Sequence, residues 1–350
     1  MTYQRDFERR LRIGVVGVGH HSYRNILPAL HYLPVDLVAL CDMNDALLQR
    51  TALEYRGVAT YTRTAEMYER EHLDAVLICT GALHHPDLAI EAMRAGLHAW
   101  TEKPPAMRVE GVDRMIAARG DRICAVGFKK AYMPATRKTI ELIGTPEFGA
   151  LRSMLAVYPM TIPRDGAALL EQGKRHNWLD NGIHPLSLML AVGGTVDSVT
   201  TLRSPGEDAA GVVTLQFGSG AIGSFHLAGG APRGQAIERY EFYGSGQSVV
   251  IDNSVKVSYL REIPFVYQSQ RNFIGDGLSS GTIQWEANHA LATLENKALF
   301  VQGIYDELMD FCDAILDERP LQVANLEFAR HLMEVYEAAL LSNGQPVAIA

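Results

Sequence analysis

Two stretches near the start of the chain constrain its fold most strongly. Residues 12–19 read RIGVVGVG, an apolar run that closes on Gly17-Val18-Gly19 and leads into helix-compatible sequence. Residues 74–104 read DAVLICTGALHHPDLAIEAMRAGLHAWTEKP, a strand–helix–strand pattern that ends in Glu102-Lys103-Pro104. Glycines that follow a buried strand and open a helix are typical of a phosphate-binding turn. Both stretches therefore predict βαβ units of a parallel sheet.

The same alternation extends through residues 1–128, which we expect to form an α/β domain around a mostly parallel sheet. Short apolar runs predict buried strands at residues 13–18, 36–41, 75–79, 98–101 and 123–128. Amphipathic patterns predict helices near residues 22–32, 43–55, 86–95 and 107–119.

The pattern changes after about residue 128, and residues 129–350 predict an α+β domain with a large, open, mostly antiparallel sheet. The expected strands are 151–158, 196–203, 210–217, 221–228, 238–243 and 248–258. The expected helices are 132–143, 183–192, 301–317 and 326–342, and the last two could pack back on the first domain. Residues 263–298 are poorly patterned, so we expect an extended arm or loop there.

Composition excludes several classes of function. A chain of 350 residues is long enough for two domains, and its net charge of −8 disfavours nucleic acid and anionic membrane as partners. No apolar run approaches the ~20 residues that cross a bilayer, and the charged start does not resemble a signal peptide. The four cysteines are isolated, which argues against a metal site and favours a reducing cytoplasm.

The glycine turn predicts a dinucleotide site. Gly17 would permit the tight turn, and Gly19 would let the backbone approach a pyrophosphate at the start of the next helix. Ser22 takes the third position of the fingerprint, where Gly or Ala is usual. The alternative is a glycine turn of an unrelated α/β protein.

Asp42 ends the second predicted strand, 25 residues after Gly17. This is close to the ~20-residue offset of a carboxylate that binds the adenosine ribose. A carboxylate there repels a 2′-phosphate, so the sequence favours NAD over NADP. The alternative is that Asp42 only caps the helix that begins near Asn44 or Asp45.

The landmarks GVVGVGHHS, LICTGALHHPDLAIEAMRAGLHAWTEKP and DNGIH, which spans residues 180–184, resemble the Gfo/Idh/MocA oxidoreductases. That family includes glucose–fructose oxidoreductase and inositol 2-dehydrogenase. The resemblance implies a Rossmann domain, a C-terminal sheet domain that forms dimers or tetramers, and oxidation or reduction at a secondary hydroxyl of a sugar or cyclitol. It also implies a cis bond before Pro104. The positions that match the family's motifs are Thr80, His85, Glu102, Lys103, Pro104, Asp180, Gly182 and His184, and Gly81 stands where the family has proline.

Residue chemistry suggests roles for three of these positions. Hydride transfer from a hydroxyl-bearing carbon also needs a base for the hydroxyl proton, and histidine suits that step, so we expect His184 to be the acid/base. Lys103 could stabilise charge on the reacting oxygen. Asp180 precedes His184 by four residues, so both fall on one helix face if the helix begins early enough. The alternative casts Asp180 as a helix cap and His184 as a buried polar residue. Ser187 stands where the family often has aspartate.

Further residues are candidates for the rim of the pocket. We expect His20, His21 and His85 to lie near the cofactor, with Glu102 beside it. Lys130 and Tyr158 follow or end strands and could reach substrate hydroxyls. Trp178 could stack on a sugar face, although a core position is an equal alternative.

These features favour an NAD-dependent dehydrogenase of a sugar, sugar derivative or inositol. The alternatives are an NAD-dependent glycosidase that oxidises a sugar transiently, and a non-catalytic dinucleotide sensor on the same fold. We expect a small carbohydrate or cyclitol as substrate and a homodimer or homotetramer as the assembly.

Overall fold

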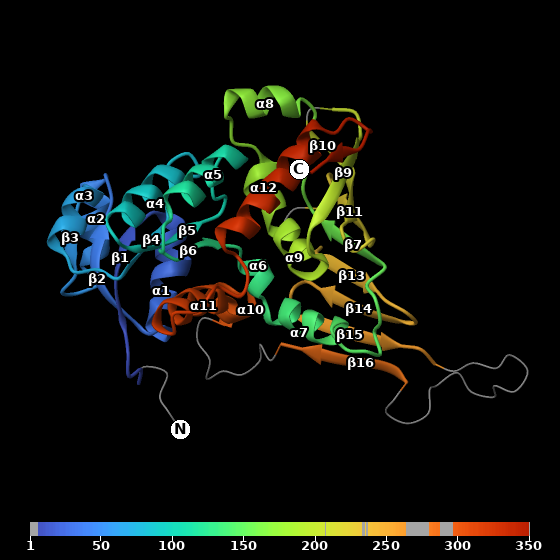
Figure 1. The fold of residues 1–350 in the computed structure, drawn as a ribbon, viewed down its shortest axis with the longest axis horizontal. Helices are drawn as coiled ribbons and strands as arrows, with labels where there is room; N and C mark the ends of the chain where they lie inside the picture. Colours follow the sequence, from blue (N-terminus) through green and yellow to red (C-terminus); the bar gives the residue numbers. More distant parts are fainter. Residues whose placement is uncertain are drawn as a thin grey trace, which may run out of the picture. The chain divides into compact units, whose positions relative to one another are not determined.

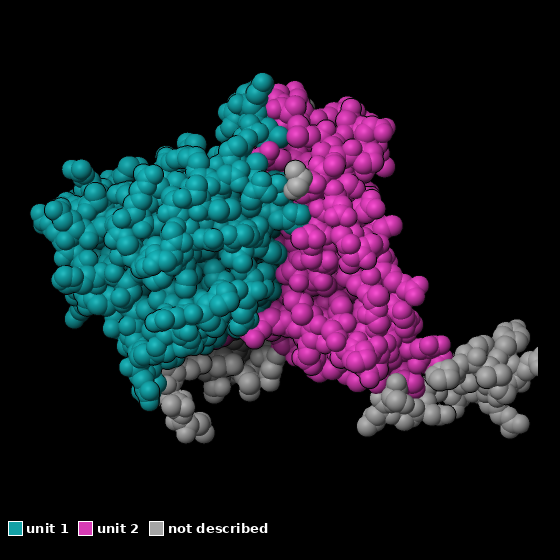
Figure 2. Space-filling model, viewed as in Figure 1, with its two compact units in different colours: residues 1–132, 169–175, 303–334 teal, residues 133–168, 176–302, 335–350 magenta. Residues whose placement is uncertain are grey.

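The computed structural model describes residues 6–206, 208–232, 235, 237–263, 280–287 and 297–349. Contacts divide the chain into two compact units, which Figure 2 colours separately. Unit 1 comprises Met1–Tyr132, Leu169–Arg175 and Gly303–Glu334; unit 2 comprises Met133–Ala168, His176–Gln302 and Val335–Ala350. The expected boundary between residues 128 and 129 stays a prediction.

Unit 1 is built on a six-stranded parallel sheet in the order β3-β2-β1-β4-β5-β6. Its strands are β1 (Leu11–Val16), β2 (Val35–Cys41), β3 (Ala59–Tyr61), β4 (Ala75–Ile78), β5 (His98–Glu102) and β6 (Cys124–Gly127). The order reverses between β1 and β4, and in such sheets ligands bind outside the carboxyl ends of the strands at this switch point. The predicted α/β fold class is confirmed.

Helices cover both faces of this sheet. In Figure 1, α4 and α5 lie over one face, and α1 and α11 lie over the other. The helical segments of unit 1 are η1 (Ser22–Ile26), α1 (Leu27–Ala29), η2 (Leu30–Tyr32), α2 (Asp45–Ala52), α3 (Thr64–Arg70), α4 (His85–Arg94), α5 (Val109–Ala118), α6 (Lys129–Tyr132) and α11 (Ile304–Leu316).

Unit 2 is built on a nine-stranded sheet in the order β16-β15-β14-β13-β7-β12-β11-β9-β17. Neighbours are antiparallel except β7 and β12, which are parallel. The strands are β7 (Ser153–Tyr158), β9 (Val196–Arg203), β11 (Gly211–Phe217), β12 (Ile222–Leu227), β13 (Arg239–Tyr243), β14 (Gln247–Asp252), β15 (Lys256–Arg261), β16 (Gly281–Glu286) and β17 (Val347–Ala348). A separate pair joins β8 (Ile162–Pro163) and β10 (Asp208–Ala209).

The helices α7 (Pro134–Ile143) and α9 (Ile183–Gly193) pack against the nine-stranded sheet. The remaining helical segments are η3 (Trp178–Gly182) and α10 (Lys297–Val301) in unit 2, and α8 (Gly166–Gln172) and α12 (Leu326–Leu341), which contribute residues to both units.

The structure corrects three sequence-based expectations. The expected strand 248–258 is a hairpin, because Asn253 (φ 50°) and Ser254 (φ 64°) adopt the left-handed backbone of a turn between β14 and β15. The expected arm 263–298 contains β16, which pairs with β15 and carries Trp285; much of the rest of that segment lies outside the described residues. The short strand β3 and the helix α3 were not expected. The three residues of β3 are all half-buried and give little periodic signal.

A buried carboxylate fixes α11 against α6. Asp310 is 4% exposed, and its Oδ2 accepts hydrogen bonds from the Tyr132 hydroxyl (2.8 Å) and the Gln322 backbone N–H (2.9 Å). Arg319 pairs with Oδ1 at 2.8 Å. These contacts neutralise the buried charge and set the register of the two helices.

Replacing Tyr132 with phenylalanine should lower the free energy of unfolding by about 1.5–3 kcal/mol, because it removes a buried hydrogen bond to a charged group. Denaturant titration measures this. The control is Tyr23→Phe, because the Tyr23 hydroxyl also bonds a carboxylate, Glu54, but at an exposed site. Equal losses in the two variants would contradict the role assigned to Asp310.

Candidate functional site

The turn after β1 is held between the ends of two strands. Gly17 has a φ of 89°, and a Cβ atom there would lie 2.5 Å from the Cys79 carbonyl oxygen. The Gly17 N–H donates to the Cys41 carbonyl at 2.8 Å. Backbone conformation and close approach therefore both require glycine at this position.

Gly19 and Gly81, unlike Gly17, are not required by packing within the chain. A Cβ atom at either position would meet no atom within 4 Å, so packing within the chain does not explain these glycines. Both lie in loops that follow strands at the carboxyl edge of the sheet. Open space beside bare backbone is what a phosphate group approaching the turn needs.

Asp42 binds the same turn through its carboxylate. Its Oδ2 accepts from the Val18 N–H and its Oδ1 from the Asn44 N–H, each at 2.9 Å. The cap of α2 is Asn44, whose side chain accepts from the Leu47 N–H, so Asp42 is not itself the cap.

Asp42 also lines a pocket of about 480 Å³ at the carboxyl edge, together with Gly17, Met43, Thr62, Thr80 and Leu88. The Thr80 hydroxyl is buried and has no hydrogen-bond partner within the described chain. A mostly apolar pocket in which the Asp42 carboxylate and an unsatisfied hydroxyl lie beside the glycine turn fits the adenosine end of a dinucleotide.

Lys103 stands on a loop that its neighbours hold firmly. The Lys103–Pro104 peptide bond is cis, as expected. Glu102, 8% exposed, accepts the Lys103 N–H at 3.0 Å through Oε2 and contacts His21 Nε2 at 2.7 Å through Oε1. Glu102 thus links the glycine turn to the lysine loop.

His85 also holds this loop, through a hydrogen bond to its backbone. Its ring is fully buried, and Nδ1 lies 2.7 Å from the Pro104 carbonyl oxygen, so Nδ1–H is the donor. Burial lowers the pKa of His85, which keeps the ring neutral. His85 therefore positions the loop, and its predicted place near the cofactor stays a prediction.

The other predicted residues of the turn differ in exposure. Ser22 is 1% exposed and lies beside the thiol of Cys79, where a larger side chain would not fit easily. His20 and His21 are exposed on the helix that follows, and His20 Nε2 lies 3.3 Å from an Arg24 nitrogen.

In unit 2, Asp180 and His184 lie on one continuous helical segment made of η3 and α9. Both side chains are half-buried. η3 is a π-helix, a form that is rare in proteins as a whole but is often found at functional sites. The residue before η3 is Asn177, so Asp180 lies inside the helix and is not its cap. η1, beside the glycine turn, is also a π-helix.

Trp178 is a core residue. It is fully buried, packs against Phe225 with ring centroids 5.8 Å apart, and donates from its indole N–H to the Tyr336 carbonyl at 3.2 Å. A Cβ atom at Gly182 would lie 2.5 Å from the indole. Trp178 therefore cannot stack on a sugar. Its ring packs the helix that carries Asp180 and His184 against the core of unit 2.

The remaining expected residues are placed as follows. Ser187 is fully buried, and its hydroxyl donates to the His184 backbone carbonyl at 2.8 Å. It therefore holds the backbone of the helix and does not bond the His184 imidazole in place of the family's aspartate. Lys130, on α6, is 3% exposed. Tyr158 ends β7, and burial with the nearby Glu238 raises its pKa to about 12.

Sequence reasoning missed Glu307, which is 3% exposed in the first turn of α11. Burial and Glu102 raise its pKa, while Lys129 and Lys103 oppose the shift. A signal was present, because Glu307 shares the apolar stripe of Ile304, Leu308 and Phe311.

The residues predicted to bind the dinucleotide and the Lys103 loop thus meet at one edge of unit 1, whereas Asp180 and His184 lie in unit 2. Their convergence on one reacting atom stays a prediction. Across the described ranges we find no group of side chains suited to a metal ion, and no helix with the length and apolar character of a membrane span.

Comparison with known proteins gives matches over both units. Residues 11–128 match the family model described as an oxidoreductase family with an NAD-binding Rossmann fold, and residues 136–250 match the GFO/IDH/MocA C-terminal domain.

A myo-inositol 2-dehydrogenase of Thermotoga maritima is 26% identical over 264 residues, covering 69% of this chain and 75% of that protein. An α-N-acetylgalactosaminidase of Shewanella oneidensis is 29% identical over 160 residues, which cover 42% of this chain and 35% of that protein.

Among solved structures, the WlbA dehydrogenase of Bordetella pertussis, in complex with NADH and UDP-GlcNAcA, superposes with a TM-score of 0.70 at 20% identity, covering 98% of this chain and 99% of that one. The N-terminal part is an NAD-binding Rossmann domain. The chain belongs to the Gfo/Idh/MocA family of oxidoreductases.

Proposed function

We propose that this protein transfers a hydride between NAD and a secondary hydroxyl of a sugar, sugar derivative or inositol. The observation that carries the proposal is the Lys103 loop. It stands at the end of β5, tied by Glu102 to the residues of the glycine turn. A loop fixed in this way presents an ammonium group beside a bound dinucleotide. The similarity to a myo-inositol 2-dehydrogenase supports the substrate class.

The protein's own groups supply the proton chemistry. NAD, when bound, accepts or returns the hydride. His184 takes the hydroxyl proton during oxidation and returns it during reduction. The Lys103 ammonium group donates a hydrogen bond to the reacting oxygen and stabilises its developing negative charge. Asp180, one helical turn before His184, orients the substrate or the imidazole. Tyr158 and Lys130 remain candidates for substrate hydroxyls.

A panel of sugars, sugar acids and inositols with NAD or NADP, followed by the absorbance of reduced nicotinamide, tests the reaction. We expect net NADH from at least one substrate. The likeness to an α-N-acetylgalactosaminidase supports a second candidate, a glycosidase that oxidises its sugar transiently. Release of a glycoside's leaving group without net NADH would favour that candidate.

His184→Ala should lower turnover by about 10²–10⁴-fold, the range for a positioned acid or base, with little change in NAD affinity. Lys103→Ala should also lose activity, and the double variant should lose less than the product of the two effects if both act on one proton transfer. Steady-state kinetics measures all three. His72→Ala is the control, because His72 is exposed in unit 1. Near-normal turnover of both single variants would eliminate this mechanism.

NAD should raise the melting temperature more than NADP at equal concentration, since the Asp42 carboxylate repels a 2′-phosphate. Asp42→Ala should narrow that difference, although it also removes the bond to the turn at Val18. Asp45→Ala is the matched control, because Asp45 is exposed on α2 and does not line the pocket. A wild-type preference for NADP would contradict the role of Asp42.

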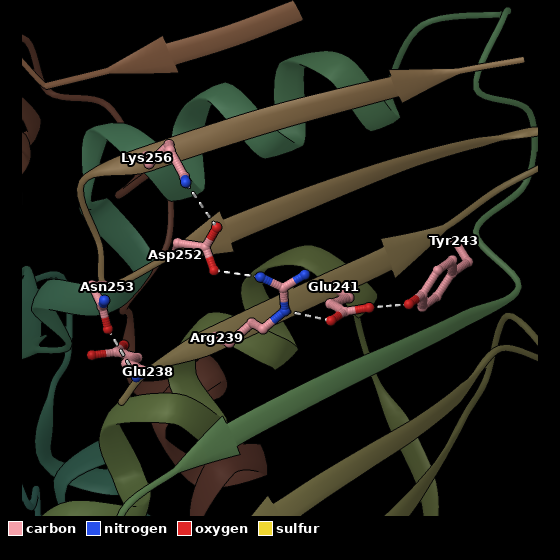
Figure 3. A network of polar contacts seen from close by, with 7 residues as sticks. All are labelled: Glu238, Arg239, Glu241, Tyr243, Asp252, Asn253 and Lys256. Carbon is pink, nitrogen blue, oxygen red and sulfur yellow. Dashed lines mark hydrogen bonds and ion pairs between the residues drawn. The ribbon is translucent and has the colours of Figure 1, made fainter. Parts of the chain in front are cut away.

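We propose that the protein is a homodimer or homotetramer joined through the outer face of the unit 2 sheet. Figure 3 shows charges on β13–β15 that compensate one another: Arg239 pairs with Glu241 and Asp252, and Asp252 with Lys256. Compensated charges can be buried against a second copy at lower cost than isolated ones.

Leu260 is 40% exposed on β15. Leu260→Asp would place a charge in the proposed interface, so it should shift the protein toward monomer in sedimentation velocity. Leu53→Asp is the control, because Leu53 is 79% exposed and lies in unit 1. A monomeric wild-type protein, or equal effects of both substitutions, would contradict the proposed interface.

A further inference from the structure

His176 stands at the start of the helix that carries Asp180 and His184. The first helical residue is Asn177, so His176 lies directly before the first turn. Its ring nitrogen Nδ1 accepts a hydrogen bond from the Leu179 backbone N–H, three residues on, at 3.3 Å. This is the contact that a helix N-cap makes, usually through the side chain of Ser, Thr, Asp or Asn. Here a titratable imidazole makes it.

The side chain of Asn177 does not compete for this role. Its Oδ1 accepts from the Asn181 amide at 2.6 Å, and its Nδ2 donates to the Thr161 hydroxyl at 3.2 Å. Leu179 is fully buried, and its N–H is one of the first donors of the helix, which have no carbonyl partner within it. The His176 ring is thus the group that satisfies this donor.

The helix α12 holds the imidazole through Tyr336. Nε2 of His176 lies 3.1 Å from the Tyr336 hydroxyl oxygen, and the two rings stack with centroids 6.0 Å apart and planes 14° from parallel. Because Nδ1 accepts a hydrogen bond, the proton of the neutral ring is on Nε2, which donates to Tyr336. Tyr336 is 1% exposed, and its carbonyl also accepts the Trp178 indole N–H. These contacts fix the ring in one orientation and one tautomer.

His176 also contacts Asp180 through the backbone. The Asp180 N–H donates to the His176 carbonyl at 3.1 Å. His184 follows four residues later on the same continuous helical segment. The turn that His176 caps therefore sets where both side chains lie.

We propose that His176 is a positioning residue for Asp180 and His184. Its neutral imidazole caps the helix that carries them, and protonation of the ring releases the cap. An imidazolium has an N–H on both nitrogens, so it cannot accept the bond from Leu179. The positive end of the helix dipole acts in the same direction, because it repels a cation at this terminus. The inference rests on the proposed function for the use of Asp180 and His184 in catalysis, but the cap is testable without substrate.

The surroundings of the ring favour its neutral form. Burial lowers the pKa of His176, and the Asp180 carboxylate opposes that shift. Tyr336 faces the ring from α12, and Lys174 and Arg175 precede it on the exposed chain before the helix. Since the native pKa lies below the ordinary value of 6.5, the unfolded state binds the proton more readily. The stability that the neutral ring contributes is therefore present at neutral pH and is lost as the pH falls below that value.

Amide hydrogen exchange of the intact protein, read by mass spectrometry at residue resolution, tests the cap. His176→Ala removes the acceptor, so the protection of the Leu179 amide at pH ~7.5 should fall by about 2–30-fold, the range for loss of a helix cap. His176→Asn supplies an amide oxygen that caps helices well and does not titrate, so it should restore the protection. Asp165→Ala is the matched control, because Asp165 is exposed and accepts the Ala168 N–H at the start of α8 at 3.3 Å. It should leave the Leu179 amide unchanged.

Acid distinguishes the imidazole from an ordinary cap. Between pH ~7.5 and pH ~5 the Leu179 amide of the wild type should lose protection, after correction for its intrinsic exchange rate, whereas His176→Asn should keep it. Unchanged protection in folded His176→Ala would overturn the inference. So would an equal loss on acidification in the wild type and His176→Asn.

Turnover tests the positioning role. On a sugar or inositol that the protein oxidises, His176→Ala should lower kcat by about tenfold or more, because a misplacement of ~1 Å can cost about 10²-fold. The KM for NAD should change less, and His176→Asn should recover most of the kcat at pH ~7.5. Loss of the cap with an unchanged kcat would contradict the positioning role. A cap that behaves as expected in a protein that oxidises no sugar or inositol would uphold the cap and count against the proposed function instead.

Discussion

The contact between the glycine turn and the ends of two strands organises unit 1. Gly17 donates to the end of β2 and lies against the carbonyl at the end of β4, where a side chain has no room. Since the sheet order reverses between β1 and β4, this contact also sits at the switch point. Asp42 then holds the turn from β2, and Glu102 connects it to the end of β5.

The fold was largely readable from the sequence, because parallel βαβ units leave strong periodic signals. The elements that were missed had weak or misleading signals. β3 is a three-residue edge strand, and the β14–β15 turn contains no glycine, so its left-handed Asn253 and Ser254 looked like strand interior. β16 pairs with β15 although its residues are mostly exposed.

Site residues were readable where short motifs carry backbone requirements, as at Gly17 and the Lys103–Pro104 bond. Tertiary burial was not readable. Trp178 precedes Asp180 by two residues, yet its ring points into the core beneath Gly182. His85 matches a family position, but only the structure shows that it holds the Pro104 carbonyl.

A π-helix accompanies each of the two predicted site segments: η1 (Ser22–Ile26) follows the glycine turn, and η3 (Trp178–Gly182) contains Asp180. A π turn holds about one residue more than an α turn. Deleting a single residue there would let the π turn relax to an α turn, so the helix beyond it would keep nearly the same phase. Asp180 and His184 would still share one helix face if they came to lie three residues apart instead of four. These two segments should therefore tolerate the loss of one residue better than an ordinary α-helix does, whereas the same deletion within α9 would rotate every residue beyond it by about 100°.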